Sequence, residues 1–300
     1  MKTFLYRPQS SFFRRALFQV HLWTGIVAGS YIFVVCVTGA ALVFRIDMQR
    51  ASYPHLFTPG VGVEVEPADI LETLRTAYPG WRVSGVDAPT TARPTYLGYV
   101  ARGDRFLTLL IDPVSARVLG ELPERGFVRT VQQLHFDLLA GRTGRVVNGI
   151  GAVLLLAMCL TGSIIWWPGI GSWRRGFTVD FRRSWKRINW DLHSAIGFWL
   201  FLFMLMWGIS GFYLGVPEPF SNFVDSISDP DAFLGDRPGD IVLSWLTRLH
   251  FGRWRDMPWL KAFWAVVGLV PALMFVTGVV MWWNRVMRRR PNVSVDEAVA

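Results

Sequence analysis

Four long stretches of the chain contain no Asp, Glu, Lys or Arg, and they limit the possible folds more than any other feature. They cover residues 16–44, 146–173, 192–217 and 262–284. Each is long enough to cross the hydrocarbon core of a bilayer, which takes about 20 helical residues. We therefore predict an integral membrane protein in the lipid bilayer. Its spanning helices are expected at residues 16–44, 146–168, 190–217 and 259–284.

The first stretch lies close to the N-terminus, where a secretory signal would lie. Its charge-free run is 29 residues long, whereas the apolar core of a signal peptide has about 7–15 residues. We therefore expect it to be retained as a spanning helix.

The distribution of charge predicts the orientation in the membrane. Three segments together hold 14 Lys and Arg against 4 Asp and Glu. They are the N-terminal arm (1–15), the basic loop (169–189, counted out to the edges of the charge-free stretches) and the C-terminal tail (285–300). The remaining segments hold 17 basic and 18 acidic residues. By the positive-inside rule, both termini are cytoplasmic. This asymmetry accounts for the net charge of +9, so we expect no nucleic-acid partner.

Two segments are expected outside the membrane, at residues 45–145 and 218–258. The first contains a small folded unit at about 63–121, in which a helix begins near Pro67 and stops at Tyr78-Pro79-Gly80. Strand-like runs follow at 81–87, 95–101, 105–111 and 116–120. A helix packed on a small antiparallel sheet fits this order. In the second segment, residues 218–240 are rich in Asp, Pro, Gly and Ser, and we expect a loop there.

Four of the five histidines recur at matched places in the two halves of the chain. His21 and His193 each open a span and are followed by a glycine four residues on, Gly25 and Gly197, and by another eighteen residues on. His135 and His250 each lie in a Leu-His-Phe tripeptide before a span that ends in Thr-Gly. Each half is therefore expected to be an out-and-back helix pair. Two pairs of the same orientation form a parallel repeat about an axis along the membrane normal.

The orientation decides which histidines can act together. It brings His21 and His193 to the cytoplasmic face, and His135 and His250 to the external face. Two histidines at one level on neighbouring helices can supply both axial ligands of a haem iron. We therefore predict two b-type haems with bis-histidine ligation. The alternative is four interfacial side chains with ordinary hydrogen bonds.

Glycines and methionines in the spans bear on the same prediction. Gly25 and Gly197 lie one turn from their histidines on the same helix face, where a macrocycle lying flat needs a missing side chain. Close helix packing explains Gly25 equally well, because it forms a G-x-x-x-G with Gly29. Met204, Met206 and Met274 also lie in spans, but we find no recurrence at equivalent positions and expect core packing. Haem propionates need cationic neighbours, and the candidates are Arg14, Arg15, Arg187, Arg129, Arg142, Arg145, Arg248 and Arg253.

Together, these residues resemble the PepSY-associated transmembrane helix family, sometimes labelled iron-regulated membrane proteins. The external unit is similar to a PepSY domain, in which a helix and strands precede Ile111-Asp112-Pro113. The resemblance covers nearly the whole chain except the loop 218–240 and the tail. It is carried by His21 through Thr38-Gly39, Leu134-His135-Phe136-Asp137, Gly141-Arg142-Thr143-Gly144-Arg145, Thr161-Gly162 through Trp166-Trp167-Pro168, and Asp191-Leu192-His193.

The resemblance implies a fold, a location and an activity. The fold is an all-α membrane domain of four transmembrane helices arranged as two parallel helix-pair repeats, with a small α+β PepSY-like periplasmic domain. Members include reductases of the bacterial inner membrane that take iron from ferric siderophores in the periplasm. The resemblance also implies the ligand pairs His21–His193 and His135–His250. The expected function is therefore that of an oxidoreductase fed by a cytoplasmic donor or a quinol.

One departure from the family leaves the substrate open. The external portion is compact for a siderophore reductase. An electron relay to another periplasmic acceptor is the nearest alternative. A haem-free accessory or regulatory subunit, whose PepSY-like unit binds a partner, is the alternative from another class.

Overall fold

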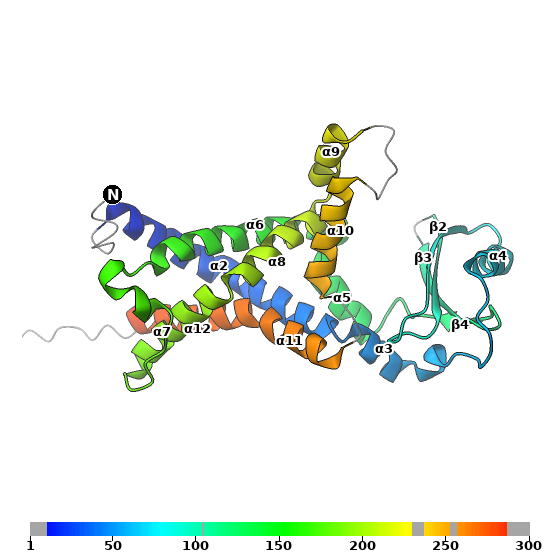
Figure 1. Ribbon diagram of the computed structural model, residues 1–300, viewed down its shortest axis with the longest axis horizontal. Helices are drawn as coiled ribbons and strands as arrows, with labels where there is room; N and C mark the ends of the chain where they lie inside the picture. The colour runs from blue at the N-terminus through cyan, green and yellow to red at the C-terminus, as the bar shows by residue number, and fades with distance from the viewer. Residues whose placement is uncertain (1–10, 104, 230–236, 253–256, 287–300) are drawn as a thin grey trace, which may run out of the picture.

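The computed structural model describes residues 11–103, 105–229, 237–252 and 257–286. Its helices form an elongated bundle, and a small sheet with one covering helix lies at one end of it (Figure 1). The expected mixture of a helical membrane part and a small α+β unit is therefore present.

Among the described residues, three helical segments are long and apolar enough to cross a membrane. A fourth crossing is made if two helices that meet at a bend of 62° count as one broken span. The segments are α2 (Phe12–Leu42), α6 (Gly141–Trp166), Pro258–Val286 with α11 (Pro258–Gly268) and α12 (Val270–Val286), and the bent pair α7 (Trp185–Trp199) with α8 (Phe201–Gly215). The chain is thus a multi-pass membrane protein.

The third span differs from the single helix expected at 190–217. Leu200, between α7 and α8, leaves the helical region of backbone space with φ −107° and ψ 10°. The break follows Gly197 by three residues, and glycine is, after proline, the residue that most weakens a helix interior.

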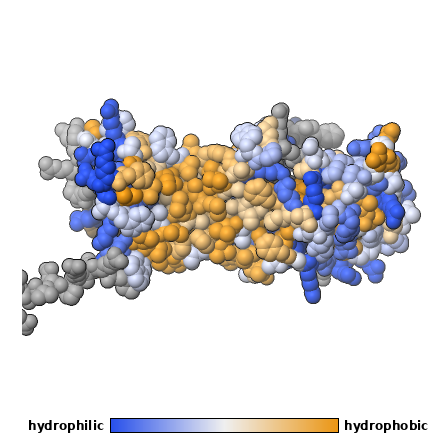
Figure 2. Space-filling view, turned by 90° about the horizontal axis from the view of Figure 1, so that it is seen from below, coloured by the Kyte–Doolittle hydropathy of each residue, from blue (hydrophilic) through white to orange (hydrophobic). Residues whose placement is uncertain are grey.

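The surface of the bundle suits a lipid environment. On the face shown in Figure 2, a broad apolar band covers its middle, and polar residues gather towards both ends. Large apolar side chains in this band are openly exposed, among them Val27 at 74 %, Leu202 at 71 % and Val266 at 66 %. A contiguous apolar surface of this kind marks a protein or membrane contact rather than a face turned to water.

Small residues bring the spans together. Helix α2 packs against α6 and α12, and α6 packs against α8. Gly149 of α6 faces Gly215 of α8 so closely that a Cβ on Gly215 would lie 2.7 Å from the Gly149 Cα. Where α2 packs against α12, Gly29 of α2 accommodates the ring of Phe275 from α12. Close backbone approach at small residues is the usual basis of helix packing in membranes.

The external unit has the helix and the four strands that the sequence predicts. Its sheet is antiparallel with the order β1 (Arg82–Asp87), β2 (Tyr96–Arg102), β3 (Arg105–Ile111) and β4 (Val118–Glu121). Helix α4 (Pro67–Ala77) buries Ile70 and Leu74 in a core with Val100, Leu109 and Ile111.

The other face of the sheet is covered by the chain that leaves the membrane. Helix α3 (Arg45–Ser52) follows α2, and a 3-10 turn, η2 (Pro54–Phe57), comes next. Leu56 and Phe57 of this turn pack against Leu110 of β3. The unit therefore draws part of its core from the segment that connects it to α2, as its small size requires.

The second external segment is helical where we expected a loop. Residues Glu218–Ile227 form α9 and Pro238–Phe251 form α10. The loop prediction for 218–240 was wrong at 218–227, because the Asp, Pro, Gly and Ser content hides a helical spacing of Phe220, Phe223, Val224 and Ile227. Residues 230–236 of the same prediction lie outside the described residues. The two helices project sideways from the bundle at its outer end (Figure 1). Arg237 fixes their junction through ion pairs to Asp225 (2.8 Å) and Asp240 (2.6 Å).

The outer histidines lie on short helices that precede the spans, as predicted. His135 is on α5 (Phe127–Asp137), and His250 is near the end of α10. Helix α5 ends at Leu138 and Leu139, which both adopt left-handed backbone with φ of 53° and 61°. Helix α10 ends at Gly252, with φ 62°. These turns separate each short helix from the span that follows it.

The buried core of the external unit gives the first prediction. Replacing the fully buried Leu109 by alanine should destabilise this unit by about 2–5 kcal/mol. The substitution would leave a cavity between the sheet and α4, where Leu109 packs with Ile70 and Leu74. Hydrogen exchange at the β2 and β3 amides of the full-length protein should accelerate. Val63→Ala, at a side chain that is 89 % exposed, is the matched control. Equal exchange in the two variants would contradict the packing described here.

Candidate functional site

The two inner histidines contact hydroxyl groups on neighbouring helices. His21 of α2 places Nδ1 2.9 Å from Oγ1 of Thr161 on α6. His193 of α7 places Nδ1 2.7 Å from Oγ1 of Thr277 on α12. The same contact therefore occurs in both halves of the chain.

The two outer histidines make corresponding contacts, but with hydroxyl groups on the helices that carry the inner histidines or directly follow them. His135 of α5 places Nδ1 2.9 Å from the carbonyl oxygen of Val35 and 3.2 Å from Oγ1 of Thr38, both on α2. His250 of α10 places Nδ1 2.9 Å from Oγ of Ser210 on α8. Helix α2 thus carries the imidazole of His21 near one end and receives that of His135 near the other, and the bent pair α7–α8 does the same with His193 and His250.

A glycine follows each of these hydroxyl residues and lies under the ring. A Cβ added to Gly39 would lie 2.7 Å from Cε1 of His135, and one added to Gly162 would lie 3.1 Å from Cε1 of His21. The corresponding distances at Gly278 and Gly211 are 3.6 Å and 3.8 Å. The sequence analysis noted these glycines and two of the Thr-Gly pairs only as markers of the repeat. The hydroxyls of Thr38 and Ser210 were missed, although the dipeptides Thr-Gly and Ser-Gly were a usable signal.

The outer histidines from the two halves lie next to each other. The centroids of the His135 and His250 rings are 6.3 Å apart, and the ring planes are inclined by 51°. A bond from imidazole to a metal ion is about 2 Å long, so two rings that bind one ion from opposite sides have centroids roughly 6 Å apart. The outer pair is therefore spaced for one metal ion between its members.

A cavity of about 260 Å³ surrounds the outer pair. It lies between the two halves of the bundle, and both histidines line it together with Arg145, Trp207, Gly211 and Trp264. Most of its wall is apolar. A mostly apolar hollow with a few convergent polar groups is the usual form of a cofactor site.

The electrostatics of the outer pair favour neutral imidazoles. Burial lowers the pKa of His135 below its usual value. Burial, and to a smaller extent the neighbouring His135, lowers the pKa of His250 to about 3. A histidine must be neutral to bind a metal, and both rings meet this condition at physiological pH.

The backbone of each short outer helix is held by side chains of neighbouring helices, which donate hydrogen bonds to the carbonyl group of its histidine. The carbonyl of His135 accepts a hydrogen bond from Nδ2 of Asn148 (2.6 Å), whose Oδ1 in turn accepts one from the Tyr31 hydroxyl (2.6 Å). The carbonyl of His250 accepts bonds from the indoles of Trp207 and Trp264, at 3.3 and 3.4 Å. These anchors tie the histidine-bearing turns to the spans, and the sequence analysis did not identify them.

The inner histidines, His21 and His193, lie on α2 and α7. Near them, Arg14 donates to the carbonyl of Ile165, one turn beyond Thr161, while its Nε is buried and has no partner among the described residues. The expected cationic neighbour Arg187 is instead paired with the buried Asp191, at 2.9 Å. Arg14 is therefore the inner arginine with a free donor directed into the protein.

The other expected cations have different surroundings. Arg145 lines the outer cavity, and Arg248 lies over the Trp245 ring. Arg253 lies outside the described residues. The remaining three, Arg15, Arg129 and Arg142, are exposed.

The glycines nearest the inner histidines face methionine side chains. A Cβ on Gly25 would lie 3.0 Å from the Met158 methyl, and one on Gly197 would lie 3.0 Å from the Met274 methyl. The statement that no methionine recurs was wrong, since Met158 precedes Thr161 by three residues as Met274 precedes Thr277. Met204 does pack in the core, against Cys159 and Val270.

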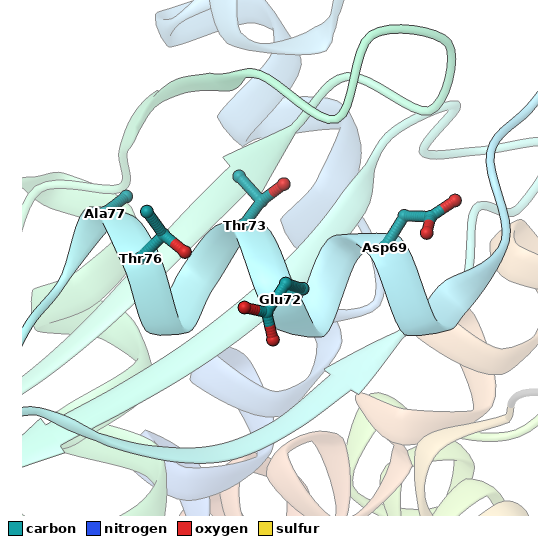
Figure 3. Close-up of a pocket in the computed structure, with 5 residues that line it drawn as sticks. All are labelled: Asp69, Glu72, Thr73, Thr76 and Ala77. Atoms are coloured by element: carbon teal, nitrogen blue, oxygen red, sulfur yellow. The ribbon is translucent and has the colours of Figure 1, made fainter.

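A second hollow, of about 390 Å³, lies on the external unit. It follows α4 and is lined by Asp69, Glu72, Thr73, Thr76 and Ala77, most of them exposed (Figure 3). Its two carboxylates lie in water, with no histidine or cysteine among the lining residues. It therefore offers less chemistry than the histidine site.

The described residues contain no group of three or more His, Cys, Asp and Glu side chains that could hold a metal ion. Bis-histidine ligation of haem requires only two protein ligands, because the macrocycle supplies the other four. Paired rings beside an apolar cavity are therefore a different kind of candidate site from a protein-only metal cluster.

A helical membrane bundle with partly buried histidines that contact hydroxyl groups on neighbouring helices defines the class of this protein. Comparison with protein families adds the specific assignment: the model of the PepSY-associated TM region matches residues 18–238 and 226–285. The chain belongs to this family. It is also 33 % identical over 86 residues to the uncharacterized protein PA4219 of Pseudomonas aeruginosa. That match covers 28 % of this chain and only a fifth of the relative's length.

The close contact between the His135 ring and Gly39 gives the second prediction. Replacing Gly39 by alanine should destabilise the protein by about 1–3 kcal/mol, because the new methyl group would overlap the imidazole. Thermal unfolding of the full-length protein in detergent, followed by tryptophan fluorescence, measures the loss. Gly171→Ala is the control, since a Cβ there meets nothing within 4 Å. If both variants unfold at the same temperature, His135 is not seated on Gly39.

Proposed function

We propose that this protein is a di-haem membrane cytochrome that carries electrons from the cytoplasmic side to an acceptor outside. His135 and His250 would hold the outer haem, and His21 and His193 the inner one. The observation that carries the proposal is the 6.3 Å spacing of the outer rings beside an apolar cavity. Haem, when bound, supplies reversible one-electron Fe(III)/Fe(II) chemistry.

The residues around the outer cavity fit a haem in three respects. The two imidazoles come from different halves of the bundle, so a macrocycle between them would be enclosed by both. The cavity wall is largely apolar, which suits the porphyrin ring. Arg145 on the same wall offers a cation for a propionate.

The inner site is supported by different observations. His21 and His193 are held in the same way as the outer pair, by Thr161 and Thr277. The buried Nε of Arg14 lacks a partner among the described residues, and a propionate oxygen would satisfy it. The methionines that face Gly25 and Gly197 would have to turn aside for a ring to lie flat there, and unbranched methionine adapts readily.

The same proposal includes the finer architecture. The bent pair α7–α8 would count as the third of four spans, and the two halves would form a parallel repeat, because their histidine contacts correspond one to one. The excess of Lys and Arg near both termini supports a cytoplasmic location for them in a bacterial inner membrane. The sheet-containing unit and α9–α10 would then be periplasmic.

The acceptor we propose is ferric iron held by a siderophore, which would be reduced by one electron to ferrous iron. The donor would be a cytoplasmic reductant or a membrane quinol. The outer histidines lie at the end of the bundle that carries the external unit (Figure 1), within reach of a periplasmic substrate. No protein acid or base is needed for this reaction, so the described residues serve to hold the ligands and to shape the cavity.

Relay to another periplasmic acceptor is the second candidate within redox chemistry. A haem-free accessory subunit is the candidate outside it, and one observation favours it: methionine methyl groups fill the space beside Gly25 and Gly197. An optical spectrum separates the classes, because a cytochrome has a Soret band and sharp α and β bands when reduced.

Haem content gives the third prediction. The full-length protein purified from haem-replete cells should contain two haems per chain. His21→Ala or His193→Ala should remove the inner haem, and His135→Ala or His250→Ala the outer one, because each iron needs both imidazoles. His55→Ala is the matched control, since this histidine is exposed in η2 outside the pairs. Losses that cross the pairs, with His21→Ala acting like His135→Ala, would refute the assignment.

Electron transfer across the membrane gives the fourth prediction. Vesicles that expose the external face should reduce an impermeant ferric hydroxamate chelate when a quinol is supplied, and a ferrous-specific chelator outside reports the product. His135→Ala and His21→Ala should each abolish this reduction, whereas His55→Ala should retain it. Reduction of both haems by the donor without reduction of the chelate would reject siderophore iron as the acceptor and leave the relay to another acceptor.

A further inference from the structure

We propose that Thr38, Thr161, Ser210 and Thr277 are positioning residues that set the tautomer of the four histidines and so present Nε2 to iron. This inference deepens the proposed function and rests on it. None of these hydroxyls would touch the metal. Each would act through the imidazole that it contacts.

The proton of each hydroxyl group is already used within its own helix. All four hydroxyls donate to the carbonyl four residues earlier on their own helix. The distances are 2.8 Å for Thr38 to Val34, 2.7 Å for Thr161 to Ala157, 2.7 Å for Ser210 to Met206, and 3.0 Å for Thr277 to Leu273. Such back-bonding is common for Ser and Thr in helices. A hydroxyl has one proton and two lone pairs, so towards the imidazole each oxygen can only accept.

Nδ1 must therefore carry the proton in all four rings. A neutral imidazole has one N–H, so Nε2 keeps its lone pair. The carbonyl of Val35 supports this result independently at His135, because a carbonyl 2.9 Å from Nδ1 can only accept a hydrogen bond. Four rings in the same tautomer, from two halves of the chain, are the form that binds iron through Nε2.

The glycine after each hydroxyl completes a two-point seat. The hydrogen bond fixes the rotation of the ring, and the absent side chain lets the ring approach the helix backbone. Partners that hold the second ring nitrogen of a metal-binding histidine normally fix its orientation and raise its basicity. In this protein all four hydroxyls hold a ring, and the glycine is also required for the approach of the ring at dipeptides 38–39 and 161–162, where a Cβ would lie 2.7 and 3.1 Å from Cε1.

The seats differ in one way that makes the proposal testable. His135 has two acceptors for Nδ1–H, the Val35 carbonyl and the Thr38 hydroxyl. For His250, only the Ser210 hydroxyl is at hydrogen-bonding distance in the described part of the chain. Removing the Thr38 hydroxyl should therefore leave His135 in place, whereas removing the Ser210 hydroxyl should free the ring of His250.

The fifth prediction compares these two variants in the full-length protein. Both Ser210→Ala and Thr38→Val should retain two haems, because the iron ligands are intact. Ser210→Ala should move the midpoint potential of the outer haem upwards, since a less basic imidazole stabilises Fe(III) less. Thr38→Val should leave this potential close to wild type, and Ser210→Thr should restore it. Redox titration followed at the α band measures the midpoint potentials of the wild-type protein and the three variants.

Two further measurements separate this proposal from the haem assignment itself. In haem-free protein, the ¹⁵N shifts of the histidine rings should report Nδ1–H for His135 and His250, and an Nε2–H tautomer would overturn the proposal. In loaded protein, a wild-type potential in Ser210→Ala, or equal shifts in Ser210→Ala and Thr38→Val, would overturn it too. Wild-type protein that binds no haem would instead refute the proposed function while leaving the tautomer measurable.

Discussion

The hydrogen bond between an imidazole and a hydroxyl on the neighbouring helix is the contact around which this bundle is arranged. In lipid, polar groups must find their partners inside the protein. Each hydroxyl satisfies its proton on its own backbone and offers its oxygen to a ring from another helix. At Gly39 and Gly162 the ring lies so close to the helix that a Cβ on the glycine would collide with it, at 2.7 and 3.1 Å from Cε1. The Thr-Gly and Ser-Gly dipeptides therefore set the distance between helices as well as the orientation of the rings.

The sequence predicted the membrane part and the external unit well, because both depend on local properties. The absence of charge over about 20 residues is sufficient to indicate a span, and the turn at Asp112-Pro113 helped to place the strands that surround it. Composition misled the prediction at α9, where Asp, Pro and Ser conceal an apolar spacing. The bend between α7 and α8 was not predicted, since no proline lies near Leu200 and a single glycine does not specify a break.

The candidate site could be predicted only in part. The repeat identified His21, His135, His193 and His250, because histidines kept at matched positions are visible in one sequence. Their hydrogen-bonding partners were not visible, since each lies on a different helix and depends on how the helices align along their axes. The replacement of threonine by serine at position 210 further hid the relation of that dipeptide to the other three. Met158 was missed for a similar reason, because its neighbours differ from those of Met274.

Helix α2 also fixes how far apart the two levels of histidines lie. His21 and Thr38, which receives His135, are 17 residues apart on one continuous helix. At 1.5 Å per residue this is about 25 Å, close to the thickness of the hydrocarbon core. For a protein with the proposed function, an electron that passes between these levels crosses most of the membrane potential. Each 100 mV is worth about 2.3 kcal/mol per charge, and a negative interior makes outward transfer favourable. The export of reducing power would thus be coupled to the energised state of the cell.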